Sequence, residues 1–327
     1  NSTDLVTDAI IAMVACYADG EDLTATYISG WTTGANNYIK IYTPTETTEV
    51  GATQRHNGTW GSGYQRTDYL IIYEEYVRID GLSIKHGDAA RMYFVSSSTG
   101  AGEVHISNCF GHRTSATSGY DVYDIAGTGP IVFKLWNNIG ITDATDSGSY
   151  AFIINDGDVT AYLYNNTGVA NGGAAFYRGD GTVYLKNNLG YNYGTGASFS
   201  GTFTSVNYCA SDDATADDWG GSGNLINQTF IFEDEADDNY HVTGRNPGVI
   251  DRGTDLSADA DLAFSTDIDG AARSGLWCIG ADEVNALYRS VGTTSSNLNT
   301  AAATVTISGN VARFSADPTG GTNNIGV

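Results

Sequence analysis

A short motif recurs through the middle of this chain and constrains its fold more than any other feature. In each copy, apolar residues alternate with polar or aromatic ones and lead to a terminal Asn or Asp-Gly. The copies read VRIDG (77–81), VHISN (104–108), FKLWNN (133–138), AYLYNN (161–166) and VYLKNN (183–188), with a weaker sixth at 203–207. Their second apolar residues are separated by 27, 29, 28 and 22 residues and are Ile79, Ile106, Leu135, Leu163 and Leu185.

This spacing is typical of a solenoid, in which no single coil can bury its own apolar face and stacked neighbours form the core. Each interval contains at least one further strand-like run, and 27–31, 38–42 and 69–73 read as earlier strands of the stack. The chain has 41 Gly and only 4 Pro, which suits short strands joined by tight turns. We therefore predict an all-β fold, a right-handed parallel β-helix.

The asparagines that end the motif predict the turn geometry. The chain must turn sharply after each inward aliphatic residue, and Asn or Gly tolerates the left-handed conformation that such a turn needs. Stacked amides can also hydrogen-bond from coil to coil. We expect a structural ladder, with Gly81 at its start, formed by Asn108, Asn137, Asn165 and Asn187.

The repeat fades after Asn207, and the segment that follows carries a resemblance. The runs NPGVIDRGTDLS (246–257) and TDIDGAARSGLWCIGADE (266–283), with the RHNGT loop (55–59), resemble the closing segment of bacterial right-handed β-helix repeat proteins of the choice-of-anchor type. The resemblance spans about residues 17–284 and implies a secreted or surface protein, but no chemistry. We predict one β-helix unit over 1–284, then a linker and a β-hairpin with a Gly-Asn turn over 285–327. No amphipathic cap is evident near 4–16, which favours further sequence upstream.

The net charge of -23 limits the partners. Such a surface repels nucleic acid and anionic lipids, and no apolar run approaches the ~20 residues that span a bilayer. We therefore expect neither nucleic-acid binding nor membrane insertion, and a location outside the cell, on the cell surface or on a virion. The four cysteines are far apart, and the sequence leaves their pairing open.

Because side chains alternate between the two faces of a strand, the motif places two outward columns of residues on one sheet. The first contains Arg78, His105, Lys134, Tyr162 and Tyr184, and the second contains Asp80, Ser107, Trp136, Tyr164 and Lys186. If the protein is an enzyme, Arg78, His105 and Lys134 are the catalytic candidates, because β-helix polysaccharide lyases use a basic residue beside the sheet. The ligand-binding candidates are Trp136, Tyr162, Tyr164, Tyr184 and Lys186, and sugar rings would stack on the four aromatic side chains. The alternative is that aromatic ladders only stabilise the sheet.

Metal binding is a further possibility in the turns. Asp267 and Asp269 offer oxygen ligands of the kind that Ca²⁺ accepts, so they are the candidates for a structural Ca²⁺ site. Asp-Gly is also ordinary turn chemistry, and no other cofactor is expected.

The leading functional hypothesis is a non-catalytic, extracellular structural or adhesive β-solenoid that is part of a cell surface, a filament or a virion appendage. Carbohydrate binding and self-association are the expected partner interactions, because open solenoid ends present unpaired backbone groups. The alternative is a polysaccharide-binding or polysaccharide-degrading protein, a lyase or a hydrolase.

Overall fold

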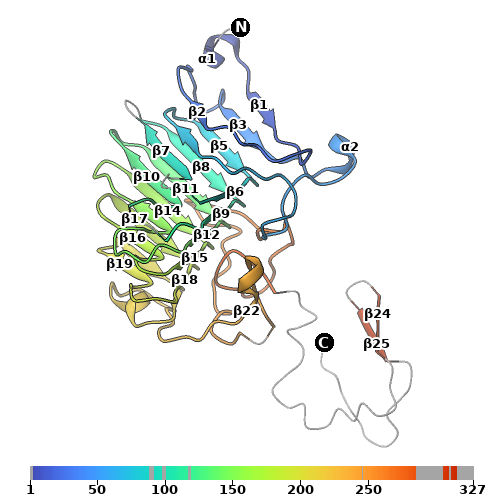
Figure 1. Ribbon diagram of the computed structural model, residues 1–327, viewed down its shortest axis with the longest axis vertical. Coiled ribbons are helices and arrows are strands. Elements are labelled where there is room, and N and C mark those ends of the chain that lie inside the picture. The colour runs from blue at the N-terminus through green and yellow to red at the C-terminus, as the bar shows by residue number, and fades with distance from the viewer. Residues whose placement is uncertain are drawn as a thin grey trace, which may run out of the picture.

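The computed structural model confirms an all-β parallel β-helix, in which strands stack from the N-terminal end to the C-terminal end of a solenoid (Figure 1). It describes residues 3–87, 92–97, 101–116, 119–244, 246–284, 305–308 and 311–314. Three parallel sheets form the walls, and from β5 to β19 each coil visits them in the order sheet 1, sheet 2, sheet 3.

The strands of the three sheets alternate along the chain. Sheet 1 contains β1 (Ala12–Ala15), β3 (Ile39–Tyr42), β5 (Val77–Asp80), β8 (Glu103–Ser107), β11 (Val132–Trp136), β14 (Thr160–Tyr164), β17 (Thr182–Lys186) and β20 (Ser205–Asn207). Sheet 2 contains β6 (Ser83–His86), β9 (Phe110–Arg113), β12 (Ile139–Thr142), β15 (Thr167–Ala170), β18 (Leu189–Asn192) and β21 (Ala210–Ser211). Sheet 3 contains β2 (Thr26–Ile28), β4 (Leu70–Ile72), β7 (Tyr93–Ser97), β10 (Tyr123–Gly127), β13 (Phe152–Ile154), β16 (Phe176–Arg178) and β19 (Phe199–Gly201).

The turn between sheets 1 and 2 has the predicted backbone conformation. Asn108, Asn137, Asn165 and Asn187 have φ values of 52°, 54°, 51° and 55°, and Gly81 has 82°. The aligned aliphatic residues, from Ile79 to Leu185, are all fully buried. The register of the repeat is therefore as the sequence predicts.

The continuous amide ladder lies one residue further along than expected. Asn138 Nδ2 donates to Asn166 Oδ1 (2.9 Å), and Asn166 Nδ2 donates to Asn188 Oδ1 (3.1 Å). All three amides also donate to sheet 1 carbonyls and are fully buried. In the predicted column, Asn137 donates to Asn108 and Asn187 to Asn165, but Asn165 donates both of its hydrogens to carbonyls outside the column.

The interior contains a second ladder, of aromatic rings. Neighbouring rings lie 4.5–5.1 Å apart and almost parallel in the order Tyr93, Tyr123, Phe152, Phe176 and Phe199. Glycines in sheet 2 face this stack at Gly111, Gly140, Gly168 and Gly190. A Cβ on Gly168 would lie 2.8 Å from the Phe176 ring and 2.9 Å from a carbonyl oxygen, so glycine leaves room for the rings.

The two ends of the stack differ. At the C-terminal end, a turn with helix η1 (Thr215–Asp217) packs Ala216 and Trp219 on the core. At the other end, helix α1 (Leu5–Asp8) buries Leu5, but β1 pairs only with β3 among the described strands and exposes Met13 and Val14. Helix α2 (Thr47–Val50) lies in the loop after β3.

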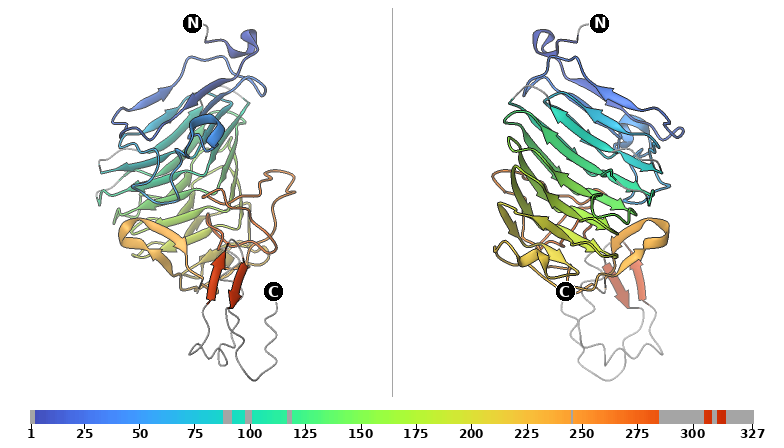
Figure 2. Two further views of the ribbon diagram at one scale, coloured as in Figure 1. Left: turned by 90° about the vertical axis from the view of Figure 1, so that its right-hand side faces the viewer. Right: turned by 60° about the vertical axis from the view of Figure 1, so that its left-hand side comes forward.

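The remaining elements lie outside the three sheets. Strands β22 (Phe232–Asp234) and β23 (Asn239–Val242) form an antiparallel hairpin, with helix η2 (Glu235–Asp237) at its tip. Residues 246–284, here called the closing segment, then contact the solenoid (Figure 2). The predicted C-terminal strand pair is β24 (Val305–Ser308) with β25 (Val311–Phe314). No described helix has the length and apolar character needed to cross a membrane.

We predict that Gly168→Ala lowers the free energy of unfolding by about 1–3 kcal/mol, because the added methyl group overpacks the aromatic ladder. Gly20→Ala is the control, because a Cβ there meets nothing within 4 Å. Urea denaturation measures both. Equal stability of the two variants would contradict the account of the glycine column.

Candidate functional site

The two outward columns of sheet 1 are in the predicted register. Arg78, His105, Lys134, Tyr162 and Tyr184 are successive partners across neighbouring strands, as are Asp80, Ser107, Trp136, Tyr164 and Lys186. The structure therefore brings each set together in space.

Side chains of the same sheet engage the three basic candidates. Lys134 Nζ lies 2.6 Å from one oxygen of Glu103, and His105 Nε2 lies 2.6 Å from the other. The Arg78 guanidinium lies 3.6 Å from the centre of the Tyr38 ring. Burial lowers the pKa of His105 to about 4, and Glu103 opposes this only in part. His105 is therefore neutral at physiological pH, and the strip has less free positive charge than its sequence suggests.

The closing segment covers the aromatic part of this face. Tyr164 is fully buried with Leu256, Leu262 and Trp277, and Trp136, Tyr162 and Tyr184 pack partly buried against this cluster. Lys186 Nζ forms an ion pair with Asp259 at 2.5 Å. The rings of Tyr162 and Tyr184 are stacked on each other, 5.1 Å apart. The candidate sugar platform thus packs against the protein's own chain.

The closing segment is held by the predicted asparagine column. Asn187 exchanges two hydrogen bonds with Thr254 (2.8 and 2.9 Å). Asn165 donates to the carbonyls of Cys278 (3.0 Å) and Gly280 (2.9 Å). Each amide therefore satisfies backbone groups that would otherwise be buried without partners.

A buried arginine completes this attachment. The Arg273 guanidinium pairs with Glu283 at 3.2 Å and donates to Asn137 Oδ1 at 3.0 Å and to the carbonyl of Ala281 at 2.7 Å. Its side chain is 0% exposed. A planar guanidinium with five donors suits this many acceptors, so the DIDGAAR and IGADE runs of the sequence have a structural role here.

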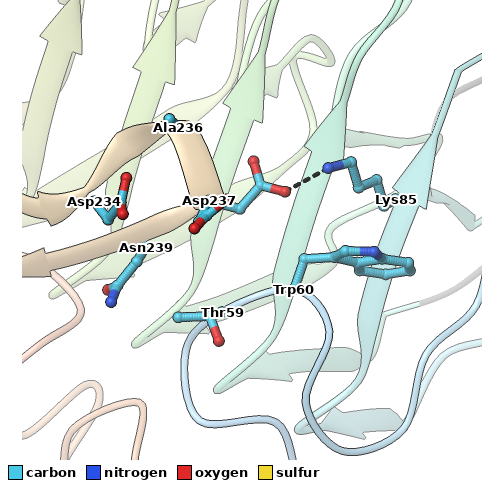
Figure 3. Close-up of a pocket in the computed structure, with 8 residues that line it drawn as sticks. Thr59, Trp60, Lys85, Asp234, Ala236, Asp237 and Asn239 are labelled. Carbon is cyan, nitrogen blue, oxygen red and sulfur yellow. Dashed lines mark hydrogen bonds and ion pairs between the residues drawn. The ribbon is translucent and has the colours of Figure 1, made fainter.

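An open depression lies between a loop, the sheet 2 residue Lys85 and the β22–β23 hairpin. It has a volume of about 510 Å³ and is lined by Thr59, Trp60, Lys85, Asp234, Ala236, Asp237, Asp238 and Asn239. Figure 3 shows Lys85 directed toward the hairpin that carries Asp234 and Asn239, with the Trp60 ring drawn below Lys85. We call it the hairpin depression. It combines an aromatic ring with carboxylates, an amide and an ammonium group.

A buried histidine, His112, links the hairpin to sheet 2 beside this depression; we call His112 with Asp143 and Asp238 the histidine clasp. His112 of β9 lies between two carboxylates, with Nε2 3.1 Å from Asp143 and Nδ1 2.7 Å from Asp238. Lys85 pairs with the other oxygen of Asp238 at 2.5 Å, and Tyr193 donates to Asp143 at 2.9 Å. Burial lowers the pKa of His112, but the two carboxylates outweigh burial and raise that pKa above its usual value.

The two aspartates proposed for Ca²⁺ have different surroundings. Asp267 accepts hydrogen bonds from the backbone N–H groups of Asp269, Ala271 and Glu283, so both of its oxygens serve the turn. Burial is the main cause that raises its pKa to about 7. Asp269 instead faces His241 and Asp282. The sequence spacing places the two aspartates together but does not reveal that these two partners join Asp269.

Sequence reasoning missed the residues of the hairpin depression. Trp60 lies in a Gly-rich loop that lacks strand alternation, and Asp238 lies after the repeat has ended. His112 follows the motif by four residues, inside a strand that the motif does not define. One signal was available: Trp60 is a large aromatic residue within a polar loop.

Comparisons with protein-family models, with characterised proteins and with solved structures give no match for this chain. The functional argument therefore depends on the geometry of the site.

We predict that His112→Gln lowers the free energy of unfolding at pH 6 by about 2 kcal/mol, because it removes a charge-assisted hydrogen bond to Asp143 and an ion pair with Asp238. The folded pKa lies above the unfolded value of about 6.5, so this contribution is complete below pH 6.5 and is lost as the pH rises through the folded pKa. Denaturant titrations of both proteins from pH 5 to 9 measure it.

His105→Gln is the control, because its effect on stability should depend on pH in the opposite direction. The folded pKa of His105 is depressed to about 4, so wild type should lose stability relative to this variant as the pH falls from 6.5 towards 4. A His112→Gln difference that is constant or grows with pH would refute the clasp.

Proposed function

We propose that this protein is a non-catalytic, extracellular adhesive β-solenoid that binds neutral carbohydrate in the hairpin depression. The observation that carries the proposal is a contrast between two aromatic sites. The aromatic part of sheet 1 is covered by the closing segment, whereas the hairpin depression is open and offers Trp60 beside polar groups.

The composition of the hairpin depression suits a sugar. An indole ring stacks on the apolar face of a pyranose, and carboxylate, amide and ammonium groups hydrogen-bond to its hydroxyls. Trp60 is partly buried by packing on the core beneath it, so its ring is held in place. Asp234 and Asp237 are exposed acceptors on the facing hairpin. The net charge of -23 opposes an acidic polysaccharide, so the ligand we propose is neutral.

The basic candidates on sheet 1 support a non-catalytic role. A lyase base must be free to reach a proton of the substrate. Here Lys134 and His105 share Glu103, and the Arg78 guanidinium lies over a tyrosine ring. These contacts favour a structural role for the strip.

A polysaccharide-degrading hydrolase is the second candidate. The observation that favours it is the group of carboxylates around the hairpin depression, Asp234, Asp237 and Asp238. Glycoside hydrolysis uses two carboxyl groups, one as acid and one as base or nucleophile.

Self-association and a surface location are further parts of the proposal. The edge of β1 exposes Met13, Val14 and neighbouring apolar residues, which supports pairing with a second copy. Sedimentation velocity tests this, and a monomer at every concentration would exclude it. The resemblance of residues 246–284 to secreted β-helix proteins supports a location outside the producing cell, which antibody labelling of intact cells measures.

We predict binding of at least one neutral glycan on an array and a loss of at least tenfold in affinity for Trp60→Ala, measured by calorimetry. Stacking on an aromatic ring contributes about 0.5–1.5 kcal/mol beyond the apolar area that it buries, and a tenfold loss in affinity corresponds to about 1.4 kcal/mol. Trp136→Ala is the matched control and should bind as wild type does, because Trp136 packs against the closing segment.

The same glycan should also be incubated with the protein and assayed for new reducing ends and unsaturated products. Binding without products supports the adhesin. Products that Asp237→Asn abolishes would support the hydrolase. If Trp136→Ala removes binding and Trp60→Ala does not, the carbohydrate site lies on sheet 1 and not in the hairpin depression.

A further inference from the structure

Three potential metal ligands meet where the hairpin contacts the closing segment. His241 of β23, Asp269 and Asp282 each direct one ligand atom into a space in which these atoms all lie within 4.8 Å of one another. His241 Nε2 and Asp269 Oδ2 are 3.1 Å apart. This is close to the ~3.4 Å that separates two ligand atoms when each is 2.0–2.2 Å from one tetrahedral ion.

Asp282 gives an independent reason to expect a cation. Its residue is only 7% exposed, and one oxygen accepts the N–H of Val242 at 2.9 Å. Desolvation of a buried, ionised carboxylate is costly, and a bound cation would offset that cost.

The local charge favours a divalent ion. Asp267 and Asp269 are joined through a hydrogen bond to the Asp269 N–H, which adds a further carboxylate beside the three ligands. The nearest arginine, Arg273, is paired with Glu283. One imidazole and two carboxylates therefore converge at a site where Asp282 is buried and Asp269 is exposed, with the Asp267 carboxylate in the adjoining turn.

The histidine is also oriented as a metal ligand. Asn239 Oδ1 accepts the backbone N–H of His241 at 3.2 Å, which identifies this atom as the oxygen of the amide. The same oxygen lies 2.6 Å from His241 Nδ1, so Nδ1 carries a hydrogen. Nε2 is then the nitrogen that can give a lone pair to an ion. Metal-bound histidines are commonly fixed in this manner by a hydrogen bond to their other nitrogen.

We propose that His241, Asp269 and Asp282 bind a divalent transition-metal ion of the Zn²⁺ class. An imidazole nitrogen is a ligand that Zn²⁺ prefers, whereas Ca²⁺ prefers oxygen ligands throughout. Of the two aspartates expected to bind Ca²⁺, this site contains Asp269 but not Asp267. Its other two ligands are His241 and Asp282.

The ion would join parts of the chain that are far apart in sequence. His241 belongs to the β22–β23 hairpin, which lines the hairpin depression. Asp269 and Asp282 belong to the closing segment. The loop at 56–63 covers the site, since a Cβ on Gly58 would lie 2.6 Å from the His241 ring. Metal binding would therefore stabilise the hairpin and the closing segment together, whatever ligand the depression takes.

The test uses the full chain after treatment with a chelator and dialysis. We expect calorimetry to show one Zn²⁺ per chain, with an affinity that falls as the pH is lowered because protons compete for the ligand atoms. Saturating Zn²⁺ should raise the Tm by about 3–8 °C, and CaCl₂ should bind at least tenfold more weakly.

Two variants and one control assign the ligands. His241→Gln and Asp282→Asn should each remove Zn²⁺ binding and the Tm increase. His112→Gln should retain both, because its carboxylate partners lie on opposite ring nitrogens and cannot share one ion with it. If a variant fails to fold, X-ray absorption of the Zn²⁺-loaded wild type should show a single imidazole among oxygen ligands.

An absence of Zn²⁺ binding to the wild-type chain would overturn the proposal. Binding that survives both ligand substitutions, or an absorption spectrum without imidazole, would overturn it as well. None of these readouts involves a glycan, so this result and the result on carbohydrate binding are independent.

Discussion

The structure depends on the pairs of side-chain amides that follow the sheet 1 strands β11, β14 and β17. The first asparagine adopts the left-handed turn, and its amide faces outward to the closing segment. The second asparagine points inward and links the coils through a buried ladder. One pair of neighbouring residues thus fixes the coil, joins it to the next and attaches the segment that covers the stack. Removing any of these amides would leave buried backbone groups without partners.

This attachment determines where function can lie. Because the closing segment is held along the asparagine column, its apolar residues Leu256 and Leu262 cover the aromatic columns of sheet 1. The face that β-helix enzymes commonly use is then partly occupied by the protein itself. The open site is the hairpin depression, where the loop that carries Trp60 and the hairpin that carries Asp238 meet beside Lys85 of sheet 2.

Much of the fold could be predicted from the sequence, because inward aliphatic residues repeat from β5 to β17 and turn asparagines follow β8, β11, β14 and β17. The outward columns followed from the same alternation. The inner ladder was missed although Asn138, Asn166 and Asn188 stand beside the predicted column, since periodicity alone does not tell which amide points inward. The residues of the proposed binding sites do not recur at the period of the repeat. Trp60, His112 and His241 come together only through tertiary contacts of the loop and the hairpin, which no local pattern encodes.

Native-state hydrogen exchange tests the central claim most directly. The N–H of Gly280 donates to the carbonyl of Asn187, and the N–H of Ala281 donates to Thr167 Oγ1. If the asparagine column holds the closing segment, these two amides should exchange as slowly as those of Ile139 and Leu189 within sheet 2. Exchange of Gly280 and Ala281 at the rate of an exposed loop, while sheet 2 stays protected, would contradict the account.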